Sequence, residues 1–116
     1  MYKRAIVPKD FVVPVQLETS RCIFQPLTQR DVVRDFDAVI SSEEFLRNVF
    51  NPKSAWPTGL SLEGNLADLG WHEVEFRNRS SFAYTIVDLS DDQTLGCAYL
   101  YPSDHSQFDV YATCWV

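Results

Sequence analysis

Three runs of residues that favour β-strands fill the C-terminal part of this chain, and only short polar connectors separate them. They extend from Ser81 to Leu89, from Leu95 to Pro102 and from Phe108 to Val116. The first run alternates residue by residue between two faces, which is the period of a strand. Strands joined by connectors this short pair with their neighbours in opposite directions. The sequence therefore predicts a three-stranded antiparallel meander.

The chain before residue 81 follows a helical period, after one short strand candidate at 21–27. Thr28 is a good N-cap residue, and Asp31 stands three residues later, as in a capping box. The helix that follows has apolar residues spaced by three and four, which places on one face Val32, Val33, Phe36, Val39 and Ile40. We expect the charged residues of this helix, Asp31 and Asp35 included, to occupy the other face.

Two further helices are predicted, at 43–50 and at roughly 61–78, with a proline-containing loop at 51–60 between them. Ser61 is the expected cap of the second of these helices. Its expected apolar stripe consists of Leu62, Leu66, Leu69, Trp71, Val74 and Phe76. The order of strand, helices and meander predicts an α+β domain over residues 21–116, with helices packed on a sheet. Because prolines interrupt residues 1–20, we expect an arm there that lies over this body.

Charge and length exclude several classes of function. The chain has 116 residues, enough for one domain, and a net charge of −6, which would repel a nucleic acid. No segment is long enough to cross a bilayer, and prolines break the apolar start that a signal peptide would need, so we expect a cytoplasmic protein without membrane contact. The dispersed Cys22, Cys97 and Cys114 suggest buried free thiols, and with two histidines they offer no metal site.

The C-terminal part also carries a recognisable pattern. The string WHEVEFRNRSSFAYTIVDLSDDQTLGCAYLYPS, followed after a short gap by FDVYATCWV, resembles the GNAT superfamily of acetyl-CoA-dependent N-acetyltransferases. The preceding strand ending in PLT, the helix opening TQRDVVRDFDAV and the loop with WP stand in the family's order. The resemblance covers residues 21–116 and implies the N-terminal half of the GNAT fold.

The resemblance implies a partial site for acetyl-CoA. FDVYATCWV would be the family's fourth strand, whose end offers backbone groups to the pantetheine arm, here from Cys114, Trp115 and Val116. A Q/RxxGxG/A loop then binds the diphosphate in the family. This sequence has no glycine after Gly96 and no Lys or Arg after Arg79. We therefore expect a truncated or degenerate domain that is inactive alone and does not bind acetyl-CoA tightly.

Residues for the chemistry are only partly present. Many relatives place an acidic general base on the fourth strand, where this chain has Tyr111, with Asp109 two residues earlier, so either is a candidate. For the acceptor amine the candidates are Glu73 and Glu75, together with Tyr99 and Tyr101, which share a strand face. The glutamates have a structural alternative as i,i+4 ion pairs, Glu73–Arg77 or Glu75–Arg79. The tyrosines have one as core or oligomer contacts.

An unpaired last strand would expose apolar residues, namely Val110, Tyr111, Ala112, Cys114, Trp115 and Val116. Such an edge invites pairing with a second copy, so we expect a homo-oligomer through this strand. Two other functions stay open. The half-fold could be a binding or assembly module, or it could be an acetyltransferase that another chain completes.

Overall fold

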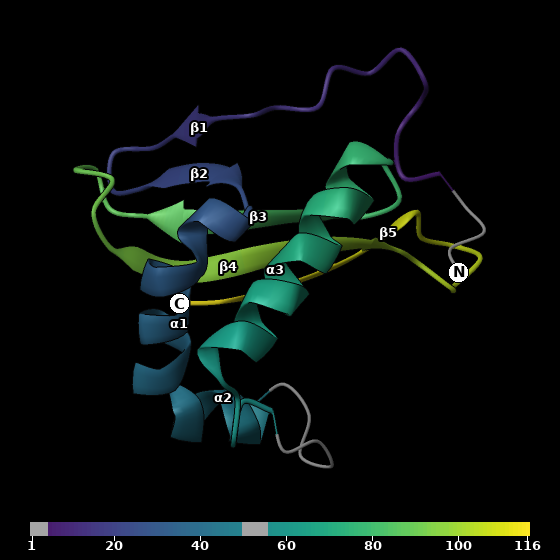
Figure 1. The fold of residues 1–116 in the computed structure, drawn as a ribbon. Helices are drawn as coiled ribbons and strands as arrows, with labels where there is room; N and C mark the ends of the chain where they lie inside the picture. The colour runs from purple at the N-terminus through teal and green to yellow at the C-terminus, as the bar shows by residue number, and fades with distance from the viewer. Residues whose placement is uncertain (1–4, 50–55) are drawn as a thin grey trace.

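A computed structural model describes residues 5–49 and 56–116 (Figure 1). In chain order its elements are β1 (Leu17–Glu18), β2 (Ile23–Pro26), the 3-10 helix η1 (Gln29–Asp31), α1 (Val32–Ser41), α2 (Glu43–Val49), α3 (Leu62–Arg77), β3 (Phe82–Val87), β4 (Thr94–Pro102) and β5 (Val110–Trp115). The predicted α+β order is confirmed. β2, β3 and β5 lie within predicted strand segments and β4 begins one residue before its own, whereas the two-residue β1 lies in the segment predicted as an arm. Phe50 and the first half of the predicted loop at 51–60 lie outside the described residues.

The five strands form one antiparallel sheet in the order β1-β2-β3-β4-β5, so each strand pairs with its neighbour in sequence. Register pairs such as Thr85 with Cys97, and Cys97 with Trp115, place these side chains on the same face. The helices pack against that face (Figure 1). Between the layers lies a core made of Leu27, Val39, Leu46, Leu69, Ala83, Cys97 and Trp115.

The polar face expected for α1 is wrong at two positions. Asp35 is only 3% exposed and Asp31 8%, whereas Val33 is exposed. The buried face of the helix follows the i,i+4 spacing of Asp31, Asp35 and Val39. Burial is tolerated because each carboxylate has donors: Asp31 accepts the Thr28 N–H at 2.9 Å, which confirms the predicted capping box.

The stripe expected for α3 is also largely wrong. Leu69 is buried as expected, but its buried companion is Asn65. Four residues that were expected to be buried in the stripe are exposed instead, namely Leu62, Leu66, Trp71 and Val74. The helix is rotated so that the Asn65 amide donates to the Asp35 carboxylate at 2.9 Å. The face of α3 that meets the core therefore carries a buried hydrogen bond to α1 beside the apolar contact of Leu69. Ser61 caps the helix as predicted, since its hydroxyl accepts the Gly64 N–H.

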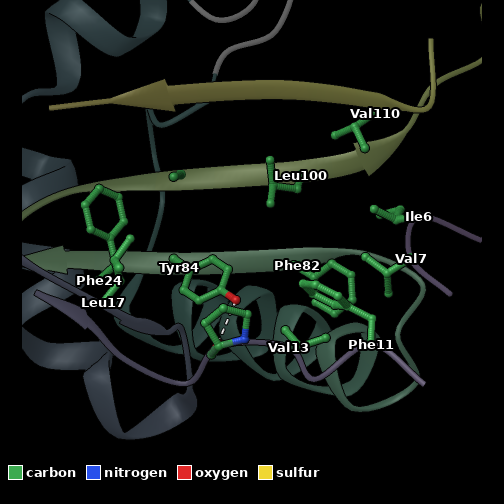
Figure 2. A pocket seen from close by; sticks show the side chains of 12 residues that line it. Ile6, Val7, Phe11, Val13, Leu17, Phe24, Phe82, Tyr84, Leu100 and Val110 are labelled. Atoms are coloured by element: carbon green, nitrogen blue, oxygen red, sulfur yellow. Dashed lines mark hydrogen bonds between the residues drawn. The ribbon is translucent and has the colours of Figure 1, made fainter. Parts of the chain in front are cut away.

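The arm lies on the sheet face opposite the helices. Two hydrogen bonds attach it, from Arg79 to the Pro8 carbonyl and from the Tyr84 hydroxyl to the Pro14 carbonyl, both at 2.8 Å. Its last residues form β1, which pairs with β2. Between arm and sheet remains an apolar groove of about 530 Å³, whose walls include Phe11, Phe82 and Leu100 (Figure 2).

Candidate functional site

A hydrogen-bonded cluster of polar side chains is buried between the helices and the sheet. Asp35 of α1 stands at its centre. Its Oδ2 accepts the Asn65 amide of α3 at 2.9 Å, and its Oδ1 accepts the Cys97 thiol of β4 at 3.3 Å. Three elements that are distant in sequence therefore meet at one carboxylate.

Tyr99 continues this cluster along β4, because residues two apart on a strand share a face. Its hydroxyl accepts the Trp115 indole N–H of β5 at 3.1 Å. On its other side, the His72 ring of α3 lies with its centroid 5.4 Å from that of Tyr99. The His72 Nδ1 atom is buried and has no hydrogen-bond partner among the residues that the structure describes. The hydrogen bond from Trp115 to Tyr99 thus connects the end of β5 to the polar cluster around Asp35.

Burial favours the uncharged form of each titratable group in this cluster. It raises the pKa of the Asp35 carboxyl, although the hydrogen bonds from Asn65 and Cys97 oppose that rise. It raises the pKa of the Cys97 thiol and of the Tyr99 hydroxyl well above their ordinary values. It lowers the pKa of His72. Cys97 is therefore a protonated thiol at neutral pH and is not placed to act as a nucleophile.

A row of tyrosines leads from the buried cluster to the surface. Tyr99 stacks on Tyr101 with ring centroids 6.2 Å apart and an interplanar angle of 13°. Tyr101 in turn lies 6.5 Å from Tyr111 of β5. The row ends at a hollow of about 460 Å³, lined by Tyr101, Pro102, Ser103, Asp104, His105 and Tyr111. The structure brings together four of the residues that the sequence singled out, Tyr99, Tyr101, Tyr111 and Trp115, and it places His72 beside them.

The other acidic candidates lie elsewhere. Asp109 precedes β5, and its carbonyl accepts the Ser103 N–H at 3.2 Å. Glu73 accepts the Gln29 N–H at 3.0 Å and lies 3.9 Å from Arg77, so the predicted Glu73–Arg77 ion pair is present. Glu75 accepts the Ser81 hydroxyl at 2.5 Å. The two glutamates attach α3 to η1 and to the start of β3.

Gly96 and Trp115 define the path of β5 at its end. A Cβ atom at position 96 would lie 1.9 Å from the Trp115 carbonyl oxygen, so only glycine permits this approach. Trp115 was expected to be exposed, but its side chain is only 3% exposed because the indole packs in the core and bonds Tyr99. Val116 is exposed as expected.

The three cysteines are free thiols, as predicted. Cys97 is buried as predicted and Cys22 is partly buried, but the prediction of burial is wrong for Cys114, which is exposed because it lies on the sheet face opposite the helices. Over residues 5–49 and 56–116, no group of three or more His, Cys, Asp or Glu side chains is placed to hold a metal ion. Within the same ranges, every helix is too short or too polar to span a membrane.

Comparison with protein-family models and with curated protein sequences finds no match. Among solved structures, one similar chain carries the description "Putative GnaT-family acetyltransferase from Bordetella pertussis". The two share 16% sequence identity and superpose with a TM-score of 0.62 over 87% of this chain. This chain spans 57% of the length of that one. The fold is therefore GNAT-like, and it corresponds to part of the similar protein.

Proposed function

We propose that this chain forms the N-terminal half of a GNAT-type N-acetyltransferase domain, and that residues 1–116 by themselves do not bind acetyl-CoA tightly or transfer its acetyl group. The observation that carries the proposal is the partial fold match, which covers 57% of the similar chain. A second observation supports the proposal: within residues 80–116 there is no Lys or Arg side chain that could bind a phosphate.

The diphosphate of acetyl-CoA is the group that these residues do not fit. A diphosphate needs aligned N–H donors or cationic side chains in place of its water. By resemblance, the end of β5 supplies only backbone groups for the pantetheine arm, from Cys114, Trp115 and Val116. The net charge of −6 adds repulsion toward a polyanion.

The tyrosine row is the part of the site that suits an acceptor amine. Tyr101 and Tyr111 line the surface hollow together with Asp104. Aromatic faces and a carboxylate attract an ammonium group. Neither candidate general base is held in a buried site. Asp109 lies in the connector before β5, and the Tyr111 phenol is 60% exposed. We propose that this half contributes to acceptor binding more than to proton transfer.

A second candidate function is an assembly module, either self-associating or completing a transferase with another chain. It is favoured by β5, whose outer edge has no strand paired to it in the part of the chain that the structure describes.

Calorimetric titration tests the first proposal. The purified chain, shown to be folded by circular dichroism, is titrated with acetyl-CoA to about 1 mM, and CoA release is measured with a panel of primary amines. We expect no saturable heat of acetyl-CoA binding, and no CoA release above the rate measured without protein. Saturation at submillimolar acetyl-CoA, or acetyl transfer to any of the amines, would overturn the proposal.

A further inference from the structure

The arm contacts the body through a few side chains. None of its described residues, 5–20, is buried, and only Ile6, Val7 and Val13 are half-buried. These three side chains line the groove against the sheet (Figure 2). Val12, next to Val13, is 85% exposed. The arm thus places isolated apolar side chains in the groove, as an extended peptide does when it binds a protein surface.

Side chains, rather than strand backbone, supply the hydrogen bonds to the arm ahead of β1. Arg79 donates to the Pro8 carbonyl, and the Tyr84 hydroxyl donates to the Pro14 carbonyl. Both donors are half-buried, so water can replace the carbonyl as their partner when the arm leaves. In the described part of the arm, backbone pairing with the sheet involves only the two residues of β1. Few hydrogen bonds therefore oppose departure of the arm.

The body keeps its core without the arm. The buried core residues of the described chain lie between Leu27 and Trp115, and none of them belongs to the arm. Protein interiors leave few voids larger than a water molecule, whereas a groove of about 530 Å³ separates the arm from the sheet. The arm is therefore not packed as a layer of the core. We expect it to open at a lower free energy than the whole domain.

The groove defines the chemistry of its occupant. Every residue that lines it is apolar except Tyr84, whose hydroxyl is bonded to Pro14. A charged side chain would lose its water there without gaining a partner. The occupant needs apolar side chains for the groove and carbonyl groups for Arg79 and Tyr84. Prolines suit it because they favour an extended chain and have no N–H group that needs a partner.

From these observations we propose that the sheet face opposite the helices is a docking site for an extended, proline-containing apolar peptide, and that the arm is its intramolecular ligand. The arm detaches and rebinds while the body stays folded. While it is bound, it keeps other peptides of this pattern out of the groove. The proposal rests on the arm in its observed place and does not depend on acetyl-CoA binding.

The first test cuts the arm from the folded chain. A recognition site for a specific protease is inserted between Ser20 and Arg21, which are exposed and follow β1. After cleavage, gel filtration at about 1 µM should separate the arm fragment from a body with an unchanged circular dichroism spectrum. Calorimetric titration should show that the fragment rebinds, with a dissociation constant between about 10 µM and 1 mM. A body that unfolds or aggregates without the fragment, a fragment that does not separate, or one that does not rebind would overturn the proposal.

The second test asks whether the fragment binds in the groove. Val13→Asp in the fragment brings a carboxylate into the groove and should weaken binding at least about tenfold. Val12→Asp is the matched control, because it adds the same charge to a side chain that faces solvent, and it should change binding less than about threefold. The uncut chain should bind the fragment at least about tenfold more weakly than the cut body, since its own arm competes. Equal effects of the two aspartates, or equal binding to the cut and uncut chains, would contradict the proposal.

Discussion

Gly96→Ala is the substitution that the structure constrains most tightly. The new Cβ would lie 1.9 Å from the Trp115 carbonyl oxygen and 2.8 Å from the Val116 Cα. An ordinary carbon–oxygen contact is about 3.3 Å, so the two backbones must separate by about 1.4 Å. These are backbone atoms, which a change of rotamer cannot move away. The end of β5 must therefore shift, and with it the Trp115 indole.

The cost of this shift has two parts. Forcing an additional carbon into a packed site costs about 1–3 kcal/mol. Displacing the indole from Tyr99 loses a hydrogen bond worth about 1 kcal/mol. We expect Gly96→Ala to lower the free energy of unfolding by about 3 kcal/mol, which is the sum of these effects at mid-range. At a urea slope of about 1.5 kcal/mol per molar, the midpoint falls by about 2 M.

Urea unfolding followed by circular dichroism measures this effect. The matched control is Gly64→Ala in α3, where the new Cβ would meet the Ser61 hydroxyl oxygen at 3.2 Å and helix propensity improves. Its free energy of unfolding should stay within about 1 kcal/mol of wild type. If Gly96→Ala unfolds at the same urea concentration as Gly64→Ala, the end of β5 does not pass over Gly96 and this reasoning is refuted.

Three further substitutions test the buried cluster and the arm. Burial raises the folded pKa of Asp35 above 3.8, so wild type should lose stability relative to Asp35→Asn as pH rises above that value; a constant difference contradicts this. Burial lowers the folded pKa of His72 below 6.5, so wild type should lose stability relative to His72→Phe as pH falls below 6.5, in urea titrations at each pH. Tyr84→Phe removes the bond to the Pro14 carbonyl and should speed limited proteolysis of the arm severalfold, with the free energy of unfolding lowered by at most about 1 kcal/mol. An unchanged cleavage rate would mean that this bond does not hold the arm.

The sequence predicts the elements of this fold well because local signals determine them. Alternating side chains locate β3, runs of strand-favouring residues between short polar connectors locate β4 and β5, and Thr28 and Ser61 mark the helix starts. Those signals act within a few residues, so they need no knowledge of distant partners. The same period also explains why Tyr99 and Tyr101 were correctly placed on one face.

Tertiary partners explain what the sequence missed. Asp35 reads as a solvent-facing carboxylate until Asn65 and Cys97 are brought to it from other elements. The one available signal was the i,i+4 spacing of Asp35 with Val39. Similarly, His72 follows Leu69 by three residues, which places both on the buried side of α3. The contact between Gly96 and the Trp115 carbonyl leaves no local signal at all.

Comparing two ligands tests most directly whether this half-fold has a site for a diphosphate. S-acetylpantetheine contains the arm that the end of β5 could contact, and acetyl-CoA adds the nucleotide diphosphate. Dissociation constants for both are obtained from amide chemical shifts of Cys114, Trp115 and Val116 in the isotope-labelled chain. We predict that acetyl-CoA binds no more tightly than S-acetylpantetheine. An advantage of tenfold or more for acetyl-CoA, equivalent to about 1.4 kcal/mol, would show that these residues do hold a diphosphate.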